Sequence, residues 1–209
     1  MRKIKKRIIS TKLLKYLAPL AVVLNSYAHA ATNTPTAKET ANFVNHLTAT
    51  NSKCNADSEH WYEKYDGSRI TLIDDMSFIG IGYEYTARNK VYDAYAQWII
   101  TKRSNHFDLK NIAEIKVLAI KATPYTTGEA CKSSISFKCK NNNACMNVEY
   151  DNQNVMDGST ENFRDKSSSF DVPFAADFET SKKIVRALLH FGKLHGLDIE
   201  DGTVNENLF

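Results

Sequence analysis

The sequence has little glycine and proline and no long run of apolar residues. Eight glycines and four prolines among 209 residues exclude a collagen-like repeat. The apolar stretch at residues 16–24 is about half of the roughly 20 residues that cross a bilayer, which excludes a polytopic membrane protein. A hydrophobic share of 43% and an aromatic share of 11% instead predict a packed globular domain.

Well-known catalytic and nucleotide-binding motifs are also absent from the sequence. It contains no G-x-S-x-G elbow, no P-loop and no dinucleotide fingerprint. His190 and His195 are five positions apart, about 140° around a helix axis, so they cannot form the i, i+4 metal pair. Asp74 and Asp75 lack a glycine-containing calcium loop. We therefore predict no catalytic residue, no metal site and no cofactor.

The first thirty residues have the three parts of a secretory signal peptide. Residues 1–15 carry seven basic and no acidic side chains, the apolar stretch follows, and Ala28-His29-Ala30 places small residues where a signal peptidase cleaves. A membrane anchor is the alternative, but the apolar stretch is too short for it. We expect cleavage after Ala30 and a periplasmic or secreted protein.

Removal of this segment changes the sign of the net charge. Because seven basic residues lie in residues 1–30, the remaining chain has 20 basic against 24 acidic residues and a net charge of −4, whereas the full chain has +3. Binding to the phosphates of nucleic acids or of an anionic membrane surface depends on clustered Lys and Arg, and a net negative charge does not favour it. We therefore expect no nucleic-acid partner and no stable membrane insertion after cleavage.

Four cysteines remain after cleavage, and an even number in an exported chain favours disulfides. Three connectivities are possible. Cys139 and Cys145 flank a polar turn, so we expect a hairpin that brings them within bridging distance, which leaves Cys54 to pair with Cys131. Zinc sites need close pairs such as C-x-x-C, which these spacings do not supply.

Two helices are predicted, one near each end of a single domain at residues 31–209. The T-x-x-E capping box that begins at Thr36 predicts a helix over residues 36–50. Apolar residues recur at helical spacing over residues 177–195, which predicts an amphipathic helix. An acidic tail follows at residues 197–209.

The region between the helices, residues 59–172, reads as strands. Asp66-Gly67 predicts one hairpin turn, and residues 88–90 predict another. The polar residues 151–168 are expected to form the longest loop. With no βαβ alternation, the pattern predicts an α+β fold: about seven strands in an antiparallel sheet or partly open barrel, closed by the C-terminal amphipathic helix.

Two stretches carry a resemblance to a known fold. The connection Phe-Asp-Leu-Lys-Asn-Ile at residues 107–112 and the helical run at residues 174–191 resemble a pleckstrin-homology-like (PH-like) barrel, in which a terminal helix plugs one end. The closing stretch is also similar to that of uncharacterised secreted bacterial proteins. The resemblance covers roughly residues 59–194 and implies binding of peptides or lipid headgroups rather than catalysis. No basic cluster that would fit a phosphoinositide appears between the first strands.

Aromatic residues gather between residues 61 and 98. Tyr and Trp there provide rigid contact area with a polar group, which suits recognition of a protein or peptide. The same residues could instead fill the core, and both readings stay open for the candidate binding residues Tyr83, Tyr85, Tyr92 and Tyr95.

The expected function is that of an exported, non-enzymatic protein that binds a protein or peptide partner. The alternative is a small periplasmic hydrolase that uses His60 as a general base, because His60 lies in the densest group of titratable side chains, residues 57–66. Strand alternation would turn Glu59 and Glu63 away from His60.

Overall fold

The computed structural model describes residues 34–57, 61–75, 78–91, 98–124, 126, 128–154 and 157–203. The chain divides into a first unit, Met1–Pro35, and a second unit, Thr36–Phe209, which contains every helix and strand that the structure describes.

The capping box at Thr36 opens the first described helix, α2 (Ala37–Thr50). The Thr36 hydroxyl accepts a hydrogen bond from the Glu39 N–H, and the Glu39 carboxylate accepts one from the Thr36 N–H at 2.8 Å. These bonds satisfy amides that the first turn of a helix leaves without partners. The predicted helix start is confirmed.

Ten described strands form two open sheets. The six-stranded sheet has the order β1-β2-β3-β4-β7-β8, and all of its pairs are antiparallel. Its strands are β1 (Cys54–Asp57), β2 (Trp61–Asp75), β3 (Phe78–Val91), β4 (Trp98–Asp108), β7 (Met146–Asn154) and β8 (Thr160–Ser167). The four-stranded sheet has the order β10-β5-β6-β9. Its strands are β5 (Ile112–Ala119), β6 (Ser133–Cys139), β9 (Ser169–Phe174) and β10 (Glu200–Asp201).

Three lengths of chain run from one sheet into the other. The chain bends at η1 (Leu109–Asn111) between β4 and β5, at η2 (Lys140–Asn142) between β6 and β7, and at Ser168 between β8 and β9. The bends are neighbours, because the Cys139 N–H donates to the Ser168 carbonyl at 2.8 Å, and Ile112, directly after η1, pairs with Cys139. The second sheet is thus a continuation of three strands of the first.

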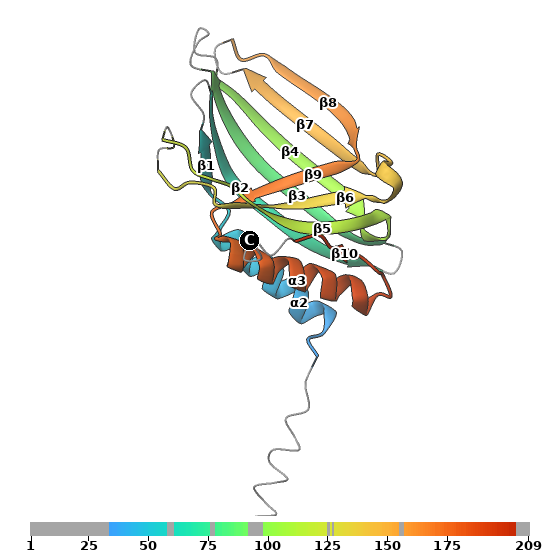
Figure 1. The fold of residues 1–209 in the computed structure, drawn as a ribbon. Helices are drawn as coiled ribbons and strands as arrows, with labels where there is room; N and C mark the ends of the chain where they lie inside the picture. Colours follow the sequence, from blue (N-terminus) through green and yellow to red (C-terminus); the bar gives the residue numbers. More distant parts are fainter. Residues whose placement is uncertain are drawn as a thin grey trace, which may run out of the picture. The chain divides into compact units, whose positions relative to one another are not determined.

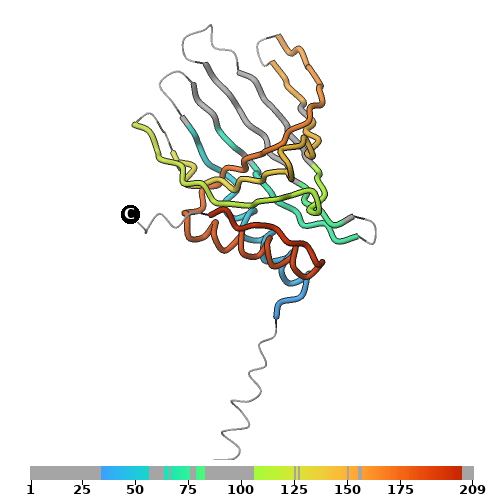
Figure 2. Tube along the Cα trace, turned by 45° about the vertical axis from the view of Figure 1, so that its right-hand side comes forward, coloured from blue at the N-terminus to red at the C-terminus, as the bar shows by residue number. Residues whose placement is uncertain are grey.

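The main core lies among the two sheets and the two helices. The helix α3 (Phe178–Leu194) packs on β5 and β6, and α2 packs on β2 and α3 (Figures 1 and 2). The apolar face of α3 is fully buried at Ile184, Leu188 and Phe191. The α+β class and the packing of an amphipathic C-terminal helix on a sheet are therefore confirmed. Among the described residues, no helix is long and apolar enough to cross a membrane.

Both predicted hairpin turns are wrong. Asp66 and Gly67 lie inside the continuous strand β2, where the register against β3 shifts between Asp66 and Arg69. Gly67 has a φ of 78° there, so the same permissive residue that suits a turn forms a bulge instead. Residues 88–90 belong to β3, which pairs with β4 through Lys90 and Trp98.

The predicted long loop is wrong as well. Residues 146–154 and 160–167 form the hairpin β7–β8, in which the Asn154 N–H donates to the Ser159 carbonyl at 2.9 Å. The turn holds Gly158 with a φ of 72°. Charged side chains on both faces of β8 hid the alternation by which a strand is recognised.

Both predicted disulfide pairs are confirmed, Cys54 with Cys131 and Cys139 with Cys145. The hairpin that was used to predict the second pair is wrong. Cys139 ends β6 in one sheet and Cys145 directly precedes β7 in the other, and these two strands do not pair. The disulfide spans a bend rather than a hairpin turn.

Candidate functional site

Most edges of the two sheets are covered or blocked by the chain itself. Along β1, the Asn55 N–H donates to the Glu129 carbonyl at 2.8 Å and the Cys131 N–H donates to the Asn55 carbonyl at 2.9 Å. The disulfide between Cys54 and Cys131 fastens this covering segment covalently. Exposed strand edges promote association, and covering them prevents it.

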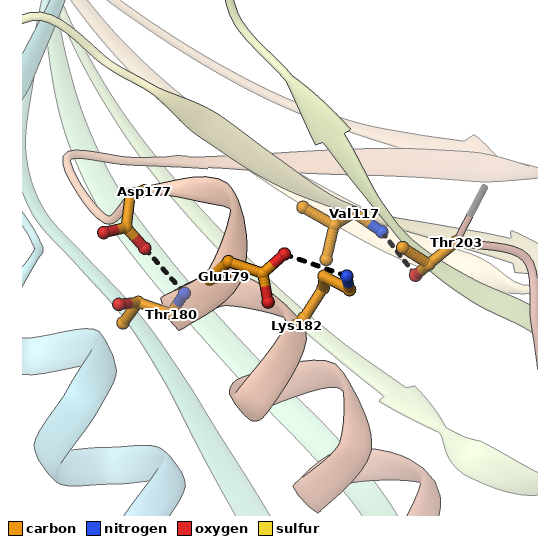
Figure 3. Close-up of polar contacts among 6 residues, drawn as sticks. All are labelled: Val117, Asp177, Glu179, Thr180, Lys182 and Thr203. Atoms are coloured by element: carbon orange, nitrogen blue, oxygen red, sulfur yellow. Dashed lines mark hydrogen bonds and ion pairs between the residues drawn. The ribbon is translucent and has the colours of Figure 1, made fainter. Parts of the chain in front are cut away.

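The edge of β5 is covered by the C-terminal segment. β10 pairs with β5 in parallel, the Gly202 N–H donates to the Ile115 carbonyl at 3.1 Å, and the Val117 N–H donates to the Thr203 hydroxyl at 3.1 Å (Figure 3). The edge strand β9 contains Pro173, which has no N–H to offer to a further strand.

β8 is different, because this eight-residue edge strand has no covering segment among the described residues, whereas the edge strand β10 has only two residues. Figure 1 shows it as the outermost strand beside β7. Its first seven residues are exposed, and it contains no proline. Phe163 is among the exposed large hydrophobic side chains, at 46%.

Hydrogen-bonded and non-hydrogen-bonded pairs alternate along an antiparallel ladder. Since Asn154 bonds to Ser159, the backbone groups of Thr160, Asn162 and Arg164 face away from β7. Lys166 follows in this series, and its N–H donates to the Asp165 carboxylate at 2.7 Å. The outer side of β8 therefore presents backbone donors and acceptors at Asn162 and Arg164.

The register connects this edge with two of the predicted binding tyrosines. Tyr85, Arg103, Tyr150 and Phe163 are successive register partners on β3, β4, β7 and β8, so their positions form one row across the sheet. Tyr83 lies two residues away on β3, where its register partners are Ile70 of β2 and Asn105 of β4. The other two candidates, Tyr92 and Tyr95, lie outside the described residues.

Charged side chains lie on the opposite face at the same edge. Arg164 faces Glu149 across the β7–β8 pair, and the distance from Arg164 Nε to Glu149 Oε1 is 2.9 Å. A depression of about 550 Å³ lies here. It is lined by Asn147, Glu149, Arg164, Asp165 and Lys166.

A second hollow, of about 600 Å³, lies between α3 and the chain that follows it. Its apolar lining residues Leu189, Leu197 and Ile199 also pack against the main core. Ile199 covers Gly192, since a Cβ atom at Gly192 would lie 3.1 Å from Ile199 Cδ1. This hollow is thus the seam along which the C-terminal segment docks.

Carboxyl groups with shifted pKa values stabilise local structure. The pKa of Asp177 is held below its usual range, chiefly because the Thr180 N–H donates to the carboxylate at 2.7 Å at the start of α3 (Figure 3). The pKa of Glu39 is also lowered, chiefly because its carboxylate accepts a hydrogen bond from the Thr36 backbone N–H. In the β7–β8 turn the pKa of Asp157 is lowered, chiefly because its carboxylate accepts a hydrogen bond from the Ser159 hydroxyl.

The partners of these carboxyl groups are residues of the same helix start or turn. His60, the proposed general base of the alternative hydrolase, lies outside the described residues. Within the described ranges, no three His, Cys, Asp or Glu side chains lie close enough to hold a metal ion.

Comparison with known proteins finds no matching family model, no matching curated protein and no matching solved structure. The site is therefore defined by its own geometry.

The residues of the β8 edge were not among the predicted binding residues. The sequence does hold one signal for them, because Asp157-Gly158 is a hairpin dipeptide of the same kind as Asp66-Gly67. A turn at Asp157-Gly158 predicts one strand before it and one after it, which correspond to β7 and β8.

Proposed function

We propose that this protein is an exported, non-enzymatic binding protein that recognises an extended segment of a protein partner. In this proposal the segment adds to the six-stranded sheet as a further strand beside β8. Main-chain hydrogen bonds then supply affinity, and alternate side chains supply specificity.

The contrast among the sheet edges carries the proposal. The chain covers β1 with a disulfide-fastened segment, covers β5 with β10 and has a proline in β9, whereas β8 presents its outward backbone groups at Asn162 and Arg164. A partner strand at β8 would also extend the row that contains Tyr85 and Phe163. In this row Phe163 would lie next to the partner strand, and Tyr85 lies three strands further into the sheet, on β3.

Export rests on the signal-peptide pattern of residues 1–30, with cleavage after Ala30. The two disulfides support it, since such bonds persist in oxidising compartments. A PH-like arrangement remains our hypothesis for the fold family, supported by the packing of α3 on strands.

Affinity capture with two matched variants tests the binding mode. Asn162→Pro removes an outward N–H without removing a bond to β7, whereas Asn162→Ala keeps that N–H. Both substitutions remove the amide hydrogen bond that Asn162 makes with Asp151, so the difference between them reports on the backbone group.

Mature wild-type protein and both variants, each checked for intact disulfides, are incubated with envelope extract, and retained proteins are identified by mass spectrometry. We expect a protein that wild type and Asn162→Ala retain and Asn162→Pro loses. Equal retention by all three would contradict pairing at β8, and retention of no specific protein would contradict the proposed binding function.

A further inference from the structure

The depression at the β8 edge carries information about the chemistry of the partner. Arg164 and Lys166 are two residues apart on β8 and lie in register with Glu149 and Asn147 of β7. In a strand such alternate residues point to the same face. Two cations therefore line the depression along the direction in which an added strand would run.

Each acidic group of the depression accepts one hydrogen bond from β8, while the ends of its two cationic side chains are open. Glu149 accepts from Arg164 Nε at 2.9 Å, and Asp165 accepts from the Lys166 backbone N–H at 2.7 Å. The Arg164 side chain is 83% exposed, and its terminal amino groups have no partner within the described part of the chain. The Lys166 ammonium group also has no partner among the described residues.

A second copy of this chain fits the edge poorly. Two-fold antiparallel pairing centred on Phe163 would place Glu161 opposite Asp165 of the second copy, twice. Pairing centred on Arg164 would place the two Arg164 side chains opposite each other. These are the two-fold pairings that engage most of β8, and like charges directly opposite each other destabilise a strand pair.

We infer that the β8 edge binds an antiparallel peptide segment with acidic side chains at two alternating positions, which enter the depression beside Arg164 and Lys166. Carboxylates make charge-assisted hydrogen bonds with guanidinium groups, frequently through two parallel N–H donors. The residue between the two acids would face Asp165, which favours a basic side chain, and the next residue would face Phe163, which favours an apolar one. This inference rests on the proposed function and adds a charge pattern to it.

Two synthetic peptides of about eight residues test the pattern. One contains Glu-Lys-Glu-Phe at its centre, and the other contains Lys-Glu-Lys-Phe with the same flanking residues. Calorimetric titrations use the mature protein, the double variant R164E/K166E and the single variant K166E. The single variant keeps the Arg164–Glu149 ion pair, so it remains informative if the double variant misfolds.

We expect wild type to bind the acidic peptide about tenfold more tightly than the reversed peptide. K166E should reduce this preference, R164E/K166E should invert it, and added salt should weaken it.

Equal binding of both peptides would overturn the charge pattern but leave strand pairing at β8 intact. Binding of neither peptide would overturn the inference, whereas the proposed function is overturned by the capture experiment, through retention of no specific protein or insensitivity of the retained protein to Asn162→Pro. Tighter binding of a single-stranded oligonucleotide through the same two cations would overturn the choice of a peptide.

Discussion

Cys139 and Cys145 form a disulfide across the bend between β6 and β7, so the bond joins the end of a strand in one sheet to the start of a strand in the other. It lies against the two neighbouring bends: Cys139 Sγ is 3.7 Å from the Ser167 carbonyl, and Cys145 Sγ is 3.7 Å from the Asn111 carbonyl. The bond therefore constrains the point at which three lengths of chain change sheets.

The two disulfides should differ in their effect on stability. In the chain-entropy model, closing the 77-residue separation of Cys54 and Cys131 contributes about 4.5 kcal/mol, and closing the 6-residue separation of Cys139 and Cys145 about 2 kcal/mol. Replacing the first pair by alanines should therefore lower the denaturation midpoint more than replacing the second pair. Urea unfolding of the two double variants checks this, and the reverse order would contradict it.

Leu188 should be essential for the attachment of α3 to the sheet. Its side chain is 0% exposed, so Leu188→Ala should lower the free energy of unfolding by roughly 2–5 kcal/mol. Leu194 on the same helix is 43% exposed, and Leu194→Ala should change it by less than about 0.5 kcal/mol. Equal effects of the two substitutions in denaturant unfolding would contradict the observed packing.

Asp177 should make stability depend on pH at the start of α3. Its folded-state pKa is lowered, so its contribution is present above the unfolded pKa of about 3.9 and is lost as pH falls through the lower folded value. Asp177→Asn keeps a good N-cap without this titration, and Asp177→Ala should cost about 0.5–2 kcal/mol. Unfolding at pH 7 and below pH 4 should show the wild type losing stability relative to Asp177→Asn. No relative loss would contradict the charged cap.

Gly202 allows β10 to lie close to β5. A Cβ atom at this position would lie 2.5 Å from Glu114 Cδ, and Glu114 pairs with Lys116 at 2.9 Å. Gly202→Ala should therefore loosen the C-terminal segment and speed hydrogen exchange at the Val117 amide, which donates to Thr203. The added substitution Glu114→Ala should restore slow exchange by making room. Failure of this rescue would show that another contact limits the approach.

Local signals in the sequence predicted the helices well. Thr36 and Glu39 form a cap within one turn, and the burial of Leu188 follows from helical spacing. The two sheets could not be predicted in this way, because the assignment of β6 and β7 to different sheets depends on pairing with distant strands. The strand β8 was missed because its polar side chains on both faces leave no period to detect.

Amide hydrogen exchange of the mature protein, with and without its captured partner, tests the central claim most directly. We predict that exchange slows at the outward amides of Asn162 and Arg164 when the partner binds, because those groups then donate to the added strand. Unchanged exchange at these two amides, with new protection confined to the hollow beside α3 at residues 189–199, would contradict recognition through β8.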